Sequence, residues 1–336
     1  MKKEIKKQLS PEDIRLSGST VLSGSPPKGS VETLVEGYVI GVDGGGTKTE
    51  AALADSKGKI LKMAKSAPSN LRNTEIDRAV FNICGAIKKV KQGKKIDSIF
   101  IGLASIEEEF KFEEEKIKKE IFKKLKNFNG KLEIGSDQTV AFRSGTDERN
   151  GIVLISGTGC VCHGWKNKKE AKTSGWGWLA DEGSGFWTGQ KGFQAVFKEL
   201  DGRGPKTKIT KILFKEWKLK RIEDLLKKVY PKDFVRQVSL ISRIVDKAAD
   251  RRDKIAKNIM IEAGRELANS AKTVIKKINF KKEIFPIVLV GGMFNSKIVL
   301  SALKKEIKKF TPKVKFIQPK VKPVTGAVKL AIENLD

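Results

Sequence analysis

The stretch Gly41-Val42-Asp43-Gly44-Gly45-Gly46-Thr47-Lys48-Thr49-Glu50 decides how the rest of the chain is interpreted. It follows the apolar run Tyr38-Val39-Ile40 and precedes a second apolar run, residues 51–54, so we expect a turn between two strands. Three consecutive glycines let backbone N–H groups approach an anion, and two threonines add hydroxyl donors. The carboxylate of Asp43, at the end of the first strand, suits a magnesium ion held through water. Taken alone, the three glycines are more typical of an ordinary glycine-rich hairpin.

The composition suits two domains with a basic surface. The chain has 336 residues, too many for one ordinary core, and 39% of them are hydrophobic. Lys and Arg number 68 against 40 Asp and Glu, and the resulting formal net charge of +28 would attract polyanions. The lysines, however, form short pairs interleaved with glutamates along the expected helices, as on solvated helix faces. With no zinc-knuckle spacing and no aromatic–basic signature, we expect no nucleic-acid partner.

Cysteine and histidine are too few for the usual thiol and metal chemistry. The three cysteines, Cys84, Cys160 and Cys162, cannot form a disulfide framework in a chain of this length. Cys160 and Cys162 alternate along an expected strand, so both thiols lie on one face, and we interpret them as packing residues. His163 is the only histidine, which argues against multi-histidine metal sites and a Ser-His-Asp triad.

The amino-terminal segment differs from the rest of the chain. Residues 1–37 are polar and rich in Ser, Gly and Lys, and we expect a mostly disordered tail with a short helical piece near residues 11–16. No run approaches the roughly 18 apolar residues of a membrane span. The Lys-rich start lacks the apolar core of a signal peptide. We therefore expect a cytoplasmic protein that makes no membrane contact.

Strands and helices alternate from Tyr38 onward. In the first part of the chain we expect strands over 38–43, 49–55, 59–65 and 96–103 and helices over 75–91 and 107–127. A second apolar strand, 151–156, runs into Ser156-Gly157-Thr158-Gly159 and continues as a strand through Trp165. Two such turns suggest two related halves that hold one phosphate chain from both sides. Further on we expect helices between 186 and 280, strands over 287–290 and 314–318, and a terminal helix from Pro323.

A single aspartate stands at the junction of an expected strand and helix. The strand 132–136 runs directly into Asp137, where the helix begins. An aspartate at the carboxyl end of a strand exposes its carboxylate while its backbone is fixed, as a catalytic group requires. A helix N-cap is the alternative, because Asp is among the preferred capping residues.

Two further segments are typical of ligand-binding loops. Residues 174–185 combine tryptophans with the neighbouring carboxylates of Asp181 and Glu182. Trp faces can cover a pyranose while carboxylates accept its hydroxyl groups; packing of the tryptophans is the alternative. Gly291-Gly292, between an expected strand and helix, would let the adenine and ribose of a nucleotide approach closely.

Together these segments resemble the actin-like sugar-kinase superfamily, and within it the N-acetylglucosamine kinase group of the BadF/BadG/BcrA/BcrD-type ATPase family, over residues 38–332. The resemblance implies an α/β fold of two ribonuclease-H-like (actin-like ATPase) domains with a nucleotide cleft between them. The implied domains are residues 38–145 and 146–336, with the last helix able to pack back on the first domain. ATP, Mg2+ and an amino sugar such as N-acetylglucosamine are the implied ligands.

The resemblance also implies roles for particular residues. The implied ATP- and phosphate-binding residues are Gly44, Gly45, Gly46, Thr47, Lys48, Gly157, Thr158, Gly159, Gly291 and Gly292, and Asp43 is the implied metal residue, acting through water. The implied sugar-binding residues are Asn70, Asp137, Gly175, Trp176, Gly177 and Asp181. Asp137 is the implied general base, accepting a proton from a sugar hydroxyl that we expect to be O6. Residues 323–327 resemble the closing turn of the nucleotide site.

Two departures from the family pattern are visible. Gln138 follows the implied base where the family commonly has a small residue, and Gly102-Leu103-Ala104-Ser105 is less rich in glycine than in relatives. The cysteines are not arranged to hold a cluster, which argues against the iron–sulfur activators of the family. The alternative function is an ATP-hydrolysing activator or regulatory ATPase without a sugar acceptor. Aromatic and apolar residues at the closing face are compatible with a homodimer, and the sequence leaves the acceptor sugar open.

Overall fold

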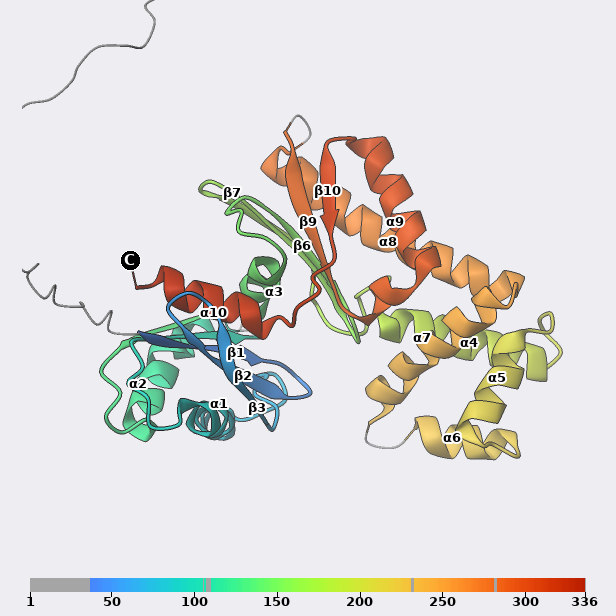
Figure 1. Cartoon of the computed structure of the whole chain (residues 1–336). Helices are drawn as coiled ribbons and strands as arrows, with labels where there is room; N and C mark the ends of the chain where they lie inside the picture. Colours follow the sequence, from blue (N-terminus) through green and yellow to red (C-terminus); the bar gives the residue numbers. More distant parts are fainter. Residues whose placement is uncertain (1–36, 105, 107–109, 231–232, 281–282, 336) are drawn as a thin grey trace, which may run out of the picture. The chain divides into compact units, whose positions relative to one another are not determined.

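The computed structural model describes residues 37–104, 106, 110–230, 233–280 and 283–335. The expected tail lies outside these residues apart from Gly37, and so does Ser105 of the second departure. The described strands form two five-stranded sheets, each with helices on both faces (Figure 1). This arrangement is an α/β fold.

The first sheet has the strand order β3-β2-β1-β4-β5. Its strands are β1 (Tyr38–Gly44), β2 (Thr49–Asp55), β3 (Ile60–Ser66), β4 (Ser98–Leu103) and β5 (Lys131–Ser136). The pairs β1–β2 and β2–β3 are antiparallel, whereas β1–β4 and β4–β5 are parallel. All of β4 is buried, as expected for a strand covered on both faces. The hairpin predicted around the three glycines is confirmed.

Helices from both ends of the chain cover the first sheet. Helices α1 (Ile76–Lys91) and α2 (Glu114–Lys124) lie on one face, and α10 (Val324–Glu333) lies on the other (Figure 1). Helix α10 comes very close to β1, because a Cβ atom at Gly41 would lie only 2.3 Å from the backbone nitrogen of Val328. Gly41 is therefore required for this packing. Helix α10 thus contributes to one of the hydrophobic clusters that cover the first sheet, and α1 and α2 contribute to the other.

The second sheet repeats the topology of the first. Its strands are β6 (Gly151–Ser156), β7 (Cys160–Lys166), β8 (Lys169–Ser174), β9 (Phe285–Val290) and β10 (Val314–Ile317). The order β8-β7-β6-β9-β10 matches β3-β2-β1-β4-β5 strand for strand, with the same parallel and antiparallel pairs. The hairpins β1–β2 and β6–β7 therefore occupy equivalent places in two ribonuclease-H-like sheets.

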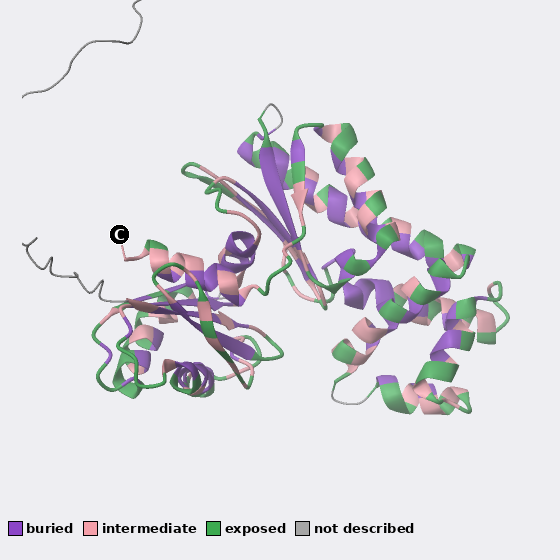
Figure 2. Cartoon of the chain, in the orientation of Figure 1, coloured by how far each residue is buried: buried purple, intermediate pink, exposed green. Residues whose placement is uncertain are grey.

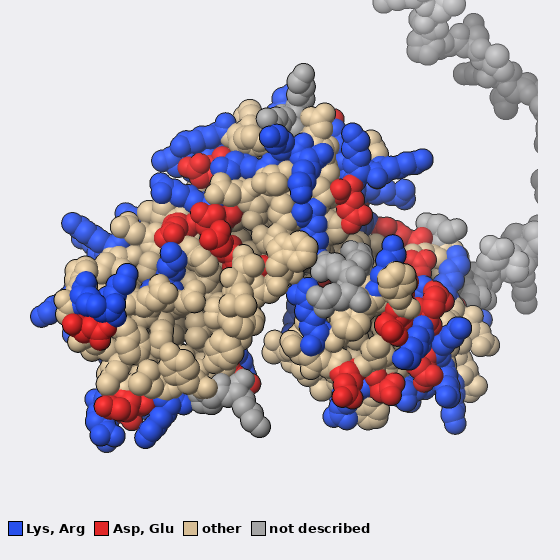
Figure 3. All heavy atoms as spheres, turned by 180° about the vertical axis from the view of Figure 1, so that it is seen from behind, with Lys and Arg blue, Asp and Glu red and all other residues tan. Residues whose placement is uncertain are grey.

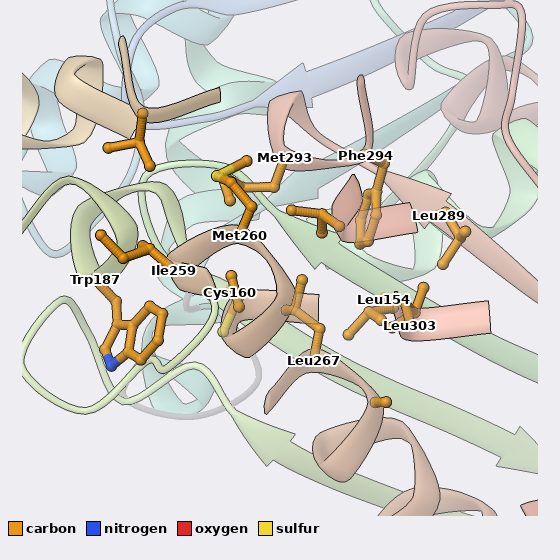
Figure 4. Packing of buried hydrophobic residues seen from close by; sticks show 14 of the residues in the cluster. Leu154, Cys160, Trp187, Ile259, Met260, Leu267, Leu289, Met293, Phe294 and Leu303 are labelled. Carbon is orange, nitrogen blue, oxygen red and sulfur yellow. The ribbon is translucent and has the colours of Figure 1, made fainter. Parts of the chain in front are cut away.

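One face of the second sheet carries most of the remaining helices. These are α4 (Gly185–Leu200), α5 (Lys208–Trp217), α6 (Ile222–Val229), α7 (Phe234–Asp250), α8 (Lys254–Ile278) and α9 (Lys297–Phe310). They share one hydrophobic cluster with the sheet, in which Cys160 lies among Leu154, Leu267 and Met260 (Figure 4). The opposite face packs against α3 (Asp137–Gly145) through Phe142, Val153 and Val288. Figure 2 shows the central strands between these layers, such as β9, as mostly buried.

Two expectations about elements were wrong. Strand β8 was not predicted, because Ala171 is its only apolar residue and, as an edge strand, it is only partly buried. The charged helix expected over 107–127 is shorter: a 3-10 turn at Lys111–Glu113 precedes α2, which ends at Lys124, and residues 107–109 lie outside the described ones. Among the residues that the structure describes, no helix is long and apolar enough to cross a membrane. The domain boundaries stay a prediction.

Candidate functional site

The β1–β2 turn exposes its central residues. The N–H of Gly45 donates to the carbonyl oxygen of Lys48 at 3.1 Å and closes the turn, leaving Thr47 and Lys48 exposed. The segment after β3 holds the turn from one side, since the N–H of Ser69 donates to the Gly45 carbonyl oxygen at 3.2 Å. The hydroxyl of Thr49 also donates to Ser69 Oγ at 2.8 Å. Of the two threonines, Thr47 is therefore available to a ligand and Thr49 is part of the support.

Two carboxylates face each other at the base of this turn. Asp43 and Glu50 are direct partners across the β1–β2 ladder. Glu50 is buried and forms ion pairs with Lys48, with Lys322 at 3.0 Å and with Lys65 at 4.0 Å. Burial raises the pKa of Glu50, but hydrogen bonds from Lys48 and Lys322 outweigh it, so the net pKa lies below its usual value. Glu50 therefore stays ionised and holds the lysines.

The pKa of Asp43 is shifted in the opposite direction. Burial raises the pKa of Asp43 to about 6, with a further upward contribution from Glu50 that Lys48 partly offsets. Among the residues described, its carboxylate has no hydrogen-bond partner. A carboxylate left without a partner at the mouth of a turn suits a cation.

The surroundings of Asp43 fit a hydrated magnesium ion. Within the described part of the chain, no group of three or more His, Cys, Asp or Glu side chains could enclose a metal. Mg2+ needs no such cage, because it retains several waters and binds through one or two carboxylates plus substrate phosphates. Asp43 supplies one carboxylate of this kind.

The second turn is supported by the start of a helix. The N–H groups of Gly185 and Phe186 donate to the carbonyl oxygens of Gly157 and Thr158 at 2.7 and 3.0 Å. Ser184 caps α4 by accepting the N–H of Trp187. The positive end of the α4 dipole thus lies against the turn, and Thr158 is exposed at its tip. This arrangement favours an anion at Thr158.

The double glycine after β9 borders the same turn. Gly291 has φ +116°, and a Cβ atom there would lie 2.2 Å from the carbonyl oxygen of Ser156, so only glycine fits. Gly292 is exposed and begins a 3-10 turn, Gly292–Asn295, and α9 follows Ser296. The expected strand, double glycine and helix are present, with this extra turn between them. Gly291, Gly292 and Gly157–Gly159 are brought together at one end of the second sheet.

Asp137 begins helix α3 but does not cap it. The Oγ atom of Ser136 accepts the N–H of Thr139 at 3.2 Å, so Ser136 is the N-cap and the alternative interpretation of Asp137 is wrong. Asp137 is partly exposed, whereas Gln138 beside it is buried. The Asp137 carboxylate is thus not committed to capping.

The segments expected to bind sugar lie close to one another. The side-chain amide of Asn70 lies beside the first turn, since a Cβ atom at Gly46 would be 3.5 Å from its Nδ2. Asn70 Oδ1 accepts the N–H of Arg72 at 3.0 Å, and Nη1 of Arg72 donates to the carbonyl oxygen of Gly175 at 3.3 Å. Arg72 therefore joins the Asn70 segment to the tryptophan loop.

The two tryptophans of the loop 175–181 differ in their surroundings. Trp178 packs against Phe186 and Phe234, with ring centroids 4.9 and 5.1 Å away. Trp176 is 80% exposed. Packing therefore accounts for Trp178, while Trp176 has a free face for a ligand.

Asp181 holds the loop from inside. It is buried, and its carboxylate accepts the N–H groups of Gly175, Trp176 and Cys160 at 2.9, 3.0 and 3.2 Å. Burial raises the pKa of Asp181, and these backbone hydrogen bonds offset part of that rise. Asp181 thus fixes Gly175 and Trp176 against β7, and Gly177 lies in the same loop.

The cysteines have the surroundings of packing residues. Cys160 and Cys162 are buried in the core of the second sheet, and Cys84, on α1, is buried in the core of the first. Burial raises the pKa of Cys160 to about 12 and that of Cys84 to about 11. The interpretation of the Cys160–Cys162 pair as core is confirmed.

Two polar residues of this region had no role in the sequence interpretation. Glu50 follows the glycine motif directly, but nothing in the sequence joins it to Lys322, 272 positions away. Arg72 contacts a residue 103 positions away. A charged residue at the inward position of a strand was the only available signal, and it pointed to Glu50 alone.

This geometry defines a class of protein: a two-sheet fold with a Gly/Thr turn at the same hairpin of each sheet. Residues 40–331 match the model of the BadF/BadG/BcrA/BcrD ATPase family. The chain belongs to this family, and the resemblance inferred from its motifs is confirmed.

Relatives with assigned activities match nearly the whole chain. The N-acetylmuramic acid/N-acetylglucosamine kinase of Clostridium acetobutylicum is 32% identical over 312 residues, which cover 89% of this chain and 99% of the relative. The N-acetyl-D-glucosamine kinase of Dictyostelium discoideum is 32% identical over 314 residues, 88% of this chain and 98% of the relative. A solved structure from Chromobacterium violaceum, provisionally described as an N-acetylglucosamine kinase, has a TM-score of 0.69 at 22% identity. It covers 88% of this chain and 99% of its own, and shows that the fold is shared.

Proposed function

We propose that this chain is an ATP-dependent carbohydrate kinase that transfers the γ-phosphoryl group of ATP to a hydroxyl of N-acetylglucosamine or a related amino sugar. Membership of an ATPase family makes ATP the nucleotide. The amino-sugar acceptor rests on the two relatives that match over almost their full length. The observation that carries the proposal is the repeated hairpin, with an exposed threonine at each tip.

The two turns would hold the β- and γ-phosphates. Thr47 and Thr158, with Lys48 and those glycine N–H groups that the turns do not themselves use, supply donors, and the α4 dipole adds positive potential at the second turn. Gly291 and Gly292 would leave room for the adenosine. When bound through water to Asp43, Mg2+ would neutralise charge on the phosphates.

Asp137 would act as the general base. Its carboxylate accepts the proton of the sugar hydroxyl while the hydroxyl oxygen forms a bond to the γ-phosphorus and the bond to the bridging oxygen of ADP breaks. The products are a sugar phosphate, ADP and the proton on Asp137, which passes to solvent. We assign the attack to O6, the primary hydroxyl of the acceptor.

The sugar would lie between the Asn70 segment and the tryptophan loop. Asn70 offers an amide to the hydroxyl groups, and the exposed face of Trp176 suits a pyranose ring. Asp181 would act by fixing Gly175, Trp176 and Gly177 rather than by binding the sugar with an oxygen that is already in use. Residues 38–145 and 146–336 would be the two domains, moving together as substrates bind.

Partners and location follow from this chemistry. ATP as substrate favours the cytoplasm. On the face shown in Figure 3, Lys and Arg side chains are scattered among acidic ones, which supports the absence of a nucleic-acid partner despite the charge of +28. A homodimer stays a prediction.

A transfer screen with γ-labelled ATP tests the proposal. The acceptors are glucose, glucosamine, N-acetylglucosamine, N-acetylmuramic acid and 6-deoxy-N-acetylglucosamine, each with and without Mg2+. We expect labelled product from an N-acylated amino sugar and none from the 6-deoxy analogue. Label on the 6-deoxy sugar would disprove O6 as the acceptor, and ATP hydrolysis without any sugar phosphate would favour the activator function instead.

A further inference from the structure

The only histidine of the chain lies next to the residue that departs from the family pattern. His163, on β7, is 2% exposed, and Gln138, on α3, is 6% exposed. Nδ1 of His163 lies 2.7 Å from Oε1 of Gln138, and its Nε2 lies 2.5 Å from Oε1 of Glu170 on β8. A series of side-chain contacts, buried at Gln138 and His163 and exposed at Glu170, thus joins the first turn of α3 to two strands of the second sheet.

Both ring nitrogens of His163 can form hydrogen bonds to Gln138 and Glu170 whether the imidazole is neutral or protonated. Glu170 accepts only, so Nε2 carries a proton. Nδ1 then either donates to the amide oxygen of Gln138 or, after a 180° turn of that amide, accepts from its NH2 group. Both arrangements keep Gln138 attached to β7.

Aromatic packing supports the same attachment. The His163 and Trp165 rings lie 4.1 Å apart, centroid to centroid, and Trp165 lies 5.4 Å from Phe142 of α3. Positions 138 and 142 share one face of a helix, and positions 163 and 165 share one face of a strand. Two side chains of α3 therefore dock on two of β7, one pair polar and one pair aromatic.

We propose that His163 and Gln138 form a positioning pair that fixes Asp137 relative to the second phosphate turn. Asp137 is the neighbour of Gln138, and β7 begins at Cys160, directly after Gly159 of the turn. Only a few residues of one strand thus separate the Gln138 contact from Thr158. Because in-line transfer depends on placing the base and the phosphoryl group to within fractions of an ångström, this short connection sets the catalytic geometry. The inference rests on the proposed function.

The test compares kinetics of the full chain with His163→Phe, Gln138→Leu and the double variant. The His163→Phe substitution keeps an aromatic ring beside Trp165 but removes the hydrogen bonds to Gln138 and Glu170. We expect each single variant to lower kcat about 10-fold to 100-fold, with the KM for ATP and sugar changed less than about threefold, and the double variant to be no slower than the singles. Ser144→Ala, another buried polar change on α3, is the matched control and should keep kcat within about threefold.

A second comparison separates positioning from general damage to the fold. In an Asp137→Asn background, His163→Phe should lower the residual turnover no further, because the residue it positions is already disabled. Melting temperatures identify any variant that is merely unfolded, and the Gln138 variant then tests the same contact from its other side. Equal losses in both backgrounds, or KM effects without kcat effects, would overturn the inference. Failure of the unmodified protein to phosphorylate any sugar would instead overturn the proposed function.

Discussion

The hydroxyl of Ser136 accepts the backbone N–H of Thr139 at 3.2 Å and so caps helix α3 in place of Asp137. The carboxylate of Asp137 is thereby not required for the helix to begin. Stability and catalysis at this position can be separated by substitution.

Asp137→Asn should lower kcat by at least about a hundredfold, the usual scale for loss of a general base. Thermal stability and the Kd values for ATP and sugar should stay close to those of the unmodified protein, because the cap remains. Stopped assays with labelled ATP, isothermal calorimetry and circular dichroism measure the three quantities. Ser136→Ala should instead lower the free energy of unfolding by about 1 kcal/mol. Substantial turnover by the Asn variant would remove Asp137 as the base.

Arg72→Ala should raise the KM for sugar about fivefold and leave the KM for ATP unchanged. The substitution removes the hydrogen bond to the Gly175 carbonyl, and one charged hydrogen bond at an exposed position contributes about 1 kcal/mol. Arg78→Ala, which removes an exposed arginine of α1 that stacks on Phe81, is the control and should change neither constant. An equal rise in both KM values would mean that Arg72 acts on the whole site rather than on the sugar loop.

Binding of ATP with Mg2+ should weaken as the pH falls through about 6, the pKa to which burial raises Asp43. The Asp43 carboxyl group is ionised above its raised pKa and protonated below it. At lower pH the hydrated cation therefore loses the negative charge that would hold it. A single proton with this pKa predicts a Kd about tenfold higher at pH 5 than at pH 7. Because phosphate itself takes up a proton near pH 6, Asp43→Asn is the necessary control. The prediction fails if the unmodified protein and the Asn variant show the same pH dependence of Kd by calorimetry.

Gly41→Ala should destabilise the protein by about 1–3 kcal/mol, since the new Cβ would lie 2.3 Å from the Val328 backbone nitrogen and α10 would have to shift. Gly85→Ala is the matched control. It adds a methyl to α1, 3.5 Å from its nearest neighbour, and should stabilise by about 0.5–1 kcal/mol. Urea denaturation gives both values, and a destabilisation of similar size at the two positions would contradict the close packing of α10.

The fold was largely predictable because its signals are local. Apolar strands, glycine turns and capped helices repeat in the same order in both halves, so both hairpins and the family followed from the sequence. Strand β8 was not predicted, because an edge strand buries little apolar surface and needs no alternation of apolar and polar residues.

The sequence indicated single candidate residues of the site, such as its glycines, threonines and acids, but not the contacts that join them. Contacts such as Arg72 with Gly175 and Gln138 with His163 join residues far apart in the sequence through polar side chains that have no periodic pattern. Asp181 shows the same limit, since its position was evident but its three backbone partners were not.

The return of helix α10 to the first sheet has a consequence for synthesis on the ribosome. Val39, Ala52 and Ala54 form one core with Ala327 and Ala331. A growing chain adds that helix about 270 residues after Ala54, roughly 15–50 s later at about 5–20 residues per second. Throughout that interval one apolar face of the nascent sheet is exposed to water. We therefore expect the first half of this protein to bind chaperones until helix α10 has been synthesised.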